Sequence, residues 1–170
     1  DRHNRNVLFN SGKDRSENVM VVDLVRNDLS KICEKGTVVV EELFGIYPFP
    51  QVYQMISTVK GEVPAGINAA DIFKATFPMG SMTGAPKKRA MELIDRYEHT
   101  KRGLFSGSIG YISAGNDMDF NVVIRSILYN GAAQYLSFQT GSAITYYCNA
   151  ESEYEECLLK AAAIKKVLNQ

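Results

Sequence analysis

The sequence predicts an α+β fold: a mostly antiparallel sheet with helices packed on its outer face. Apolar residues recur at helical spacing near both ends of the chain, at residues 11–36 and 151–168. Valine-rich alternating segments lie between them, and in the second half short turns separate successive strand patterns. Strands joined by short turns pair antiparallel, and amphipathic helices cover the apolar face of such a sheet.

The first helix is predicted to begin at Ser11, a residue type that caps helix N-termini, and to end near Gly36. Asp14 falls in line with the apolar stripe of this helix, and Glu17 falls beside it. Acidic residues on the core side of a helix are unusual for an ordinary surface helix. The stripe itself consists of Val21, Val22, Val25, Leu29 and Ile32.

The next elements are each bounded by a turn or a cap residue. We expect strands at 37–44 and 52–59, a break at 47–50, a short helix from Asn68 that ends before Pro78, a loop at 80–86, and a helix opened by Pro86.

The second half is predicted to be a β-meander followed by a helix. Asn130 and Gly131 together are a strong signal for a hairpin. The predicted strands are residues 104–112, residues 120–129, a strand from this hairpin to Thr140, and a short strand at 144–147. The last helix opens at Glu151, and its apolar stripe is Cys157, Ala161, Ile164 and Leu168.

The composition of the chain excludes several classes of protein. Of 170 residues, 45% are hydrophobic and 22% are charged, with 19 basic and 19 acidic residues. No basic stripe interleaved with aromatic residues points to nucleic acid, and no apolar run approaches the roughly 20 residues of a membrane helix. Three widely spaced cysteines without a CxxC motif predict reduced thiols and a cytoplasmic protein. The chain opens on Asp1 without Met, so we expect a piece of a longer protein.

Two acid pairs are the first candidates for chemistry. Asp14 and Glu17 form the first acid pair, and Glu153 and Glu156 form the second. A spacing of three puts both carboxylates of a pair on one helix face. Four carboxylates that met around one ion would suit Mg²⁺, which prefers oxygen ligands. On spacing alone, two solvated helix faces are the commoner explanation.

Four further positions could contact an anionic ligand. Glycines in the loop 80–86 let a ligand approach the backbone at a helix N-terminus, and the small residues 141–143 allow the same approach after a strand. Arg125 lies among strand valines and isoleucines, where its charge calls for a carboxylate partner, and Lys160 shares a helix face with the second acid pair. The alternatives are a plain loop, a sheet corner, a half-exposed arginine and a surface ion pair.

Seven segments stand in collinear order from about residue 13 to the C-terminus. They are Asp14-Arg15-Ser16-Glu17-Asn18, Val22-Asp23-Leu24-Val25-Arg26-Asn27-Asp28-Leu29, Ile56-Ser57-Thr58-Val59, Thr83-Gly84-Ala85-Pro86-Lys87, Gly107-Ser108-Ile109-Gly110-Tyr111, Met118-Asp119-Phe120-Asn121 with Ile124-Arg125, and Glu153-Tyr154-Glu155-Glu156. As a set they resemble the chorismate-utilising enzymes.

This resemblance implies that residues 1–170 are the C-terminal part of a single chorismate-binding domain of the αββα type, whose upstream part lies outside the sequence. It also implies a Mg²⁺ cofactor. Glu17 and Glu156 match positions that ligate the ion directly, and Asp14 and Glu153 match acidic positions that act through water. The metal would hold the ring carboxylate of chorismate and help to expel the 4-hydroxyl as a Lewis acid.

The resemblance also assigns substrate contacts. Arg125 matches the arginine that binds the enolpyruvyl carboxylate, and the segment Gly141, Ser142 and Ala143 matches a glycine loop whose N–H groups bind carboxylate. The other matches are a hydroxyl position at Ser81, the loop residues Thr83 and Gly84, an aromatic position at Phe105, and two catalytic positions at Gln54 and Lys160.

Three matched positions depart from the family pattern. Gln54 stands where the family has a histidine, and an amide can hydrogen-bond a substrate but cannot carry a proton. Ala143 replaces the second glycine of its loop, and Phe105 lacks the hydroxyl of the family's aromatic residue.

Within the family, the run Met-Asp-Phe-Asn at 118–121 favours members that give 4-amino-4-deoxychorismate for folate synthesis, with ammonia from a glutamine amidotransferase subunit. Members that form anthranilate, isochorismate or salicylate are the alternatives. The family's Pro-Ile-Lys/Ala-Gly-Thr motif helps to distinguish members that form 4-amino-4-deoxychorismate from members that form anthranilate. This motif would lie before Asp1. Residues 1–170 alone are therefore expected to be inactive. A non-enzymatic alternative is an interaction domain for the amidotransferase.

Overall fold

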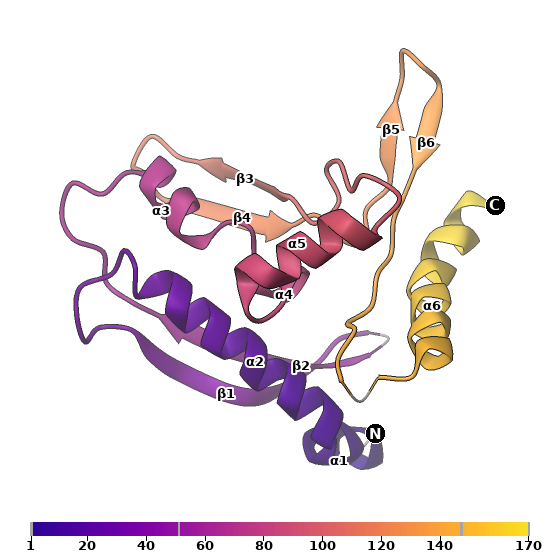
Figure 1. Cartoon of the computed structure of the whole chain (residues 1–170), viewed down its shortest axis with the longest axis horizontal. Helices are drawn as coiled ribbons and strands as arrows, with labels where there is room; N and C mark the ends of the chain where they lie inside the picture. The colour runs from indigo at the N-terminus through magenta and orange to yellow at the C-terminus, as the bar shows by residue number, and fades with distance from the viewer. Residues whose placement is uncertain (1, 51, 147, 170) are drawn as a thin grey trace. The chain divides into compact units, whose positions relative to one another are not determined.

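The computed structural model describes residues 2–50, 52–146 and 148–169 (Figure 1). The chain forms two compact units, Asp1–His99 and Thr100–Gln170. Within the described residues, all strands pair antiparallel in three two-stranded sheets. The predicted α+β class and the antiparallel pairing are therefore confirmed.

The first unit begins with helices α1 (Arg2–Asn10) and α2 (Gly12–Leu29). Ser11 caps α2 as predicted, and its hydroxyl accepts a hydrogen bond from the N–H of Asp14 at 3.3 Å. The predicted end near Gly36 is wrong, because residues 30–36 form turns instead of helix. The sequence gives no periodic signal for α1, whose apolar residues Val7, Leu8 and Phe9 are consecutive.

A long hairpin follows, made of β1 (Val39–Pro48) and β2 (Tyr53–Lys60). Helix α2 runs along this hairpin (Figure 1), and Ser57 donates a hydrogen bond to Asn18 of α2 at 2.6 Å. The predicted break at 47–50 comes too early, because β1 includes Tyr47 and Pro48. Pro48 stands at the strand end, where a missing N–H is tolerated.

Three helices complete the first unit: α3 (Ala69–Thr76), α4 (Gly80–Thr83) and α5 (Lys87–Tyr97). Asn68 caps α3 by accepting a hydrogen bond from the N–H of Asp71 at 3.1 Å, as predicted. The predicted loop at 80–86 begins with the single turn α4. Gly80 packs so closely on α2 that an added Cβ would lie 2.6 Å from Cβ of Leu24.

The second unit contains the hairpins β3 (Ser108–Ile112)–β4 (Met118–Val122) and β5 (Leu128–Asn130)–β6 (Tyr135–Ser137), followed by α6 (Ala150–Leu168). The side chain of Asn149 caps α6. The observed strands are shorter than predicted. β4 stops before Arg125, whose φ of +53° interrupts extended backbone. Residues 144–146 are not a strand, and Tyr147 of that prediction lies outside the described residues.

The described helices include none that is both long and apolar enough to cross a membrane. Cys33, Cys148 and Cys157 are free thiols, in agreement with the predicted reduced cysteines. Burial raises the pKa of the Cys33 thiol, which keeps it in the neutral, less reactive form.

Candidate functional site

In the second unit, several predicted site residues meet where α6 faces the segment 141–142. Nζ of Lys160 donates a hydrogen bond to the carbonyl oxygen of Gly141 at 3.0 Å and pairs with Oε1 of Glu156 at 2.6 Å. Ser142 donates its hydroxyl to Oε2 of Glu153, which is only 4% exposed. The second acid pair and Lys160 therefore hold the small-residue segment against α6.

Phe105 and Ala143 border this arrangement. A Cβ added to Gly141 would lie 3.8 Å from Cζ of Phe105, so the ring edge approaches this glycine closely. Ala143 is exposed. The result is a local site with an aromatic ring, small residues, two carboxylates and an ammonium group, which we name the α6 site.

Arg125 is exposed, and no ion pair with it is formed by the described residues. The prediction that Arg125 lies in a strand among valines and isoleucines is wrong, because the chain has already left β4 at this point. Its guanidinium is therefore available to a carboxylate of a ligand.

The first acid pair lies in the first half of α2. Glu17 is half-buried, with Oε1 at 4.0 Å from Nζ of Lys13, whereas Asp14 is exposed. The prediction that Asp14 lies on the core side is wrong, since α2 buries only residues of its second half.

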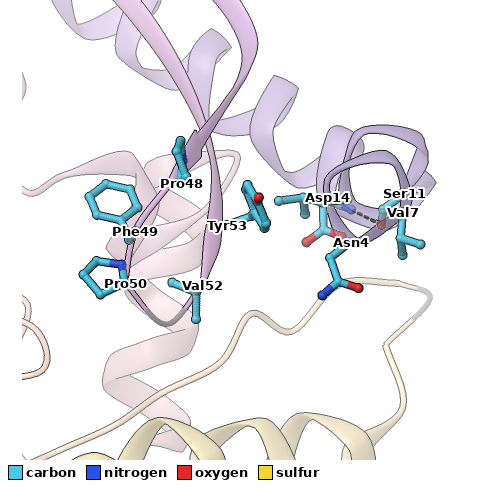
Figure 2. Close-up of a pocket in the computed structure, with 10 residues that line it drawn as sticks. Asn4, Val7, Ser11, Asp14, Pro48, Phe49, Pro50, Val52 and Tyr53 are labelled. Carbon is cyan, nitrogen blue, oxygen red and sulfur yellow. Dashed lines mark hydrogen bonds between the residues drawn. The ribbon is translucent and has the colours of Figure 1, made fainter. Parts of the chain in front are cut away.

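Asp14 lines an open pocket of about 750 Å³ between the α1–α2 junction and the tip of the β1–β2 hairpin. Figure 2 shows Asp14 on the helical side of this pocket and Tyr53 on the hairpin side. Gln54 is exposed and is the next residue of β2, so its side chain points to the opposite face of the strand.

The loop before α5 holds three further predicted residues. Ser81 is exposed, and Thr83 donates its hydroxyl to the carbonyl oxygen of Met79 at 3.1 Å. Gly84 has a φ of +134°, a conformation that L residues rarely adopt. The loop therefore turns at Gly84, and because this residue has no Cβ, the backbone there can lie close to a ligand.

One buried acidic residue was missed by sequence reasoning. The side chain of Asp28 is 5% exposed, and its carboxylate accepts hydrogen bonds from Lys87 and Lys31. Its position was a usable signal, because residue 28 falls in the apolar stripe of α2 at helical spacing after Val21 and Val25.

The chemistry of the acid pairs fits a hard cation, because all four donors are carboxylates. The described residues contain no group of three or more His, Cys, Asp or Glu arranged to hold a metal ion.

Comparisons with known proteins place these residues in a family. The family model described as chorismate binding enzyme matches residues 1–166. The chain is 46% identical over 161 residues to a probable chloroplastic aminodeoxychorismate synthase of Oryza sativa subsp. japonica, covering 94% of the chain and 18% of that protein. It is 43% identical over 164 residues to aminodeoxychorismate synthase component 1 of Salmonella typhimurium, covering 96% of the chain and 36% of that protein.

The structure resembles that of anthranilate synthase component I from Streptococcus pneumoniae. The TM-score is 0.83 at 39% identity, over 92% of this chain and 35% of that one. The chain thus spans between 18% and 36% of the length of these three relatives. Since the family model covers nearly the whole sequence and the fold agrees, this chain belongs to the chorismate binding enzyme family.

Proposed function

We propose that the protein carrying this chain is component I of an aminodeoxychorismate synthase. It would replace the 4-hydroxyl of chorismate with an amino group and form 4-amino-4-deoxychorismate for folate synthesis. The observation that carries chorismate binding is the α6 site, where small residues lie beside carboxylates and an ammonium group. The choice among the family's reactions is supported by the names of the relatives from Oryza sativa and Salmonella typhimurium.

Chorismate carries two carboxylates, and the chain offers matching groups for both. The exposed guanidinium of Arg125 binds the enolpyruvyl carboxylate, and the N–H groups of the segment 141–143 bind a second carboxylate. Phe105 packs against the ring of the substrate. The loop residues Ser81, Thr83 and Gly84 supply hydroxyl and backbone contacts.

Mg²⁺ is the proposed cofactor. Glu17 and Glu156 would ligate it directly, and Asp14 and Glu153 would act through water. Bound Mg²⁺ supplies Lewis-acid stabilisation of the leaving hydroxyl. Glu156 is paired with Lys160 at 2.6 Å, so ligation requires Glu156 to exchange that partner or share it with the ion. Lys160, which also donates to the carbonyl oxygen of Gly141, would contact the substrate from α6. Gln54 would orient the substrate by hydrogen bonds without carrying a proton.

A glutamine amidotransferase subunit is the proposed ammonia source. The name component 1 of the Salmonella typhimurium relative implies a second component of that enzyme. The intact protein should use ammonium salts alone, and it should use glutamine only with the second subunit present.

Anthranilate synthase component I is the second candidate, because the Streptococcus pneumoniae structure of that name is closely similar. Incubation of the intact protein with chorismate, ammonium and Mg²⁺, followed by chromatographic separation of the products, distinguishes the candidates. We expect 4-amino-4-deoxychorismate. Anthranilate or isochorismate as the product would overturn this assignment. A protein that captures the amidotransferase but binds neither chorismate nor Mg²⁺ would be an interaction domain instead.

A further inference from the structure

An ion pair between buried Asp28 and partly buried Lys87 joins the end of α2 to the start of α5. The side chains of Asp28 and Lys87 are 5% and 18% exposed. Nζ of Lys87 donates hydrogen bonds to Oδ2 of Asp28 and to the carbonyl oxygen of Pro78 at 2.8 Å, with a longer contact to that of Thr76 at 3.5 Å. The half-exposed Lys31 donates to Oδ1 of Asp28 at 2.8 Å.

Local helix preferences do not explain these two charges. Lys87 is the first residue of α5, where the helix dipole disfavours cations, and two more cations, Lys88 and Arg89, follow it. Asp28 is next to the last residue of α2, where the dipole disfavours anions. Charges that oppose their own helix dipoles indicate a tertiary role.

The pair closes the loop before α5 and ties it to α2. Because Lys87 binds the carbonyl oxygen of Pro78, residues 79–86 are clamped at both ends, and Asp28 anchors the clamp. Gly80, at the start of this loop, packs directly on Leu24 of α2. Figure 1 shows α4 beside α2, the helix that carries the first acid pair.

We propose that Asp28 and Lys87 are a positioning pair that fixes the loop 79–86 against α2 and thereby sets the affinity for chorismate. The position of the loop is independent of the proposed function, and only the effect on chorismate rests on it. A buried charged pair has a second consequence: replacing both charges with apolar groups restores packing but cannot restore the hydrogen bonds to the loop carbonyls. Stability and positioning can therefore be separated.

The test compares three variants of the intact protein: Lys87→Met, the double variant Asp28→Leu with Lys87→Met, and a control, Glu41→Gln with Lys60→Met. The control removes an exposed lysine–glutamate pair of the same unit. The measurements are Tm, hydrogen exchange of the peptide spanning residues 79–85, and KM and kcat with chorismate.

Lys87→Met should lower Tm, because Asp28 loses its buried partner, and the double variant should regain most of that loss. In both variants the loop should exchange at least about tenfold faster than in the wild type. KM should rise by about tenfold or more with a smaller change in kcat, since the loop positions the substrate. The control should leave all three measurements unchanged.

Wild-type exchange in the loop of the double variant would overturn the proposal. Lys87→Arg provides a second test that does not require apolar replacement. Arginine keeps a cation with several hydrogen-bond donors, so the loop should exchange more slowly in Lys87→Arg than in Lys87→Met. Equal exchange in these two variants would show that Lys87 contributes only packing. If the wild-type protein fails to bind chorismate, the proposed function falls, while the exchange results still decide whether the pair positions the loop.

Discussion

Substitution of Glu156 should affect catalysis much more than folding stability. The Glu156 side chain is 39% exposed and pairs with Lys160 one helical turn away, a contact type that contributes about 0.3–0.5 kcal/mol. Glu156→Gln in the intact protein should therefore change the free energy of unfolding by no more than about 0.5 kcal/mol. If Glu156 ligates Mg²⁺, the same variant should lose most of its Mg²⁺-dependent turnover.

The measurement is the initial rate across a Mg²⁺ titration, alongside urea unfolding. Glu155→Gln is the matched control, because Glu155 is an exposed neighbour on α6 that no proposed role includes. An unchanged Mg²⁺ dependence in Glu156→Gln would remove this residue from the metal site.

Substitution of Arg125 should affect chorismate binding but neither folding stability nor Mg²⁺ binding. Its side chain is exposed, so Arg125→Ala should alter stability by less than about 0.5 kcal/mol. Loss of charge-assisted hydrogen bonds to a substrate carboxylate should weaken chorismate binding by about 1.5–3 kcal/mol, or roughly 10- to 150-fold. Calorimetric titrations with chorismate and with Mg²⁺ check this result, with Mg²⁺ affinity expected to stay close to that of the wild type. Equal losses for both ligands would contradict a specific carboxylate contact.

At the scale of elements, the contact between α4 and α2 makes a sharp prediction. A methyl group at Gly80 would lie 2.6 Å from Cβ of Leu24, so one of the two helices must shift. Gly80→Ala should lower the free energy of unfolding by about 1–3 kcal/mol, the usual cost of overpacking.

Gly12→Ala is the control for this substitution. Gly12 is the first residue of α2 and has no atom within 4 Å of an added Cβ, so alanine should raise stability by about 0.4–1 kcal/mol. Denaturant unfolding of the intact protein measures both. A neutral Gly80→Ala would show that the two helices are not in tight contact.

Cap residues predict helix starts well in this chain, whereas strand ends are poorly predicted. The side chains of Ser11 and Asn68 accept hydrogen bonds from backbone N–H groups three residues later. This interaction depends only on residues that are near each other in the sequence. The extents of β4 and β6 depend on where pairing stops and on positive φ values at Arg125 and Gln134. Side-chain alternation carries no signal for that, because β-branched residues continue past the last paired position.

At the scale of the molecule, the described residues bury little apolar surface. Their buried hydrophobic residues are Val22, Leu24, Val123, Ala161 and Ile164. Strand β3 exposes Ile109 and Tyr111 by 67% and 62%, although two-stranded sheets are marginal without a covered face. Together with the greater length of the relatives, this leads us to propose that residues 1–170 are not sufficient for activity.

Residues 1–170 produced alone should bind a hydrophobic dye, unfold with low cooperativity and consume no chorismate. The intact protein should show weak dye binding, one cooperative transition and turnover. Differential scanning calorimetry and a chorismate absorbance assay make the comparison. Chorismate consumption by the isolated residues would refute this prediction.

Local sequence specified the α+β class, the capped helices, the hairpins and the motif set that places the chain in its family. These features depend on residues that are near each other in the sequence, so they can be predicted without knowledge of the rest of the fold. Three features needed the tertiary structure: the pairing of Asp28 with Lys87 across 59 positions, the contact of Ser142 with buried Glu153, and the exposure of Asp14. Each depends on which surfaces meet after folding, and burial of a charge is favourable only where another part of the chain supplies its partner.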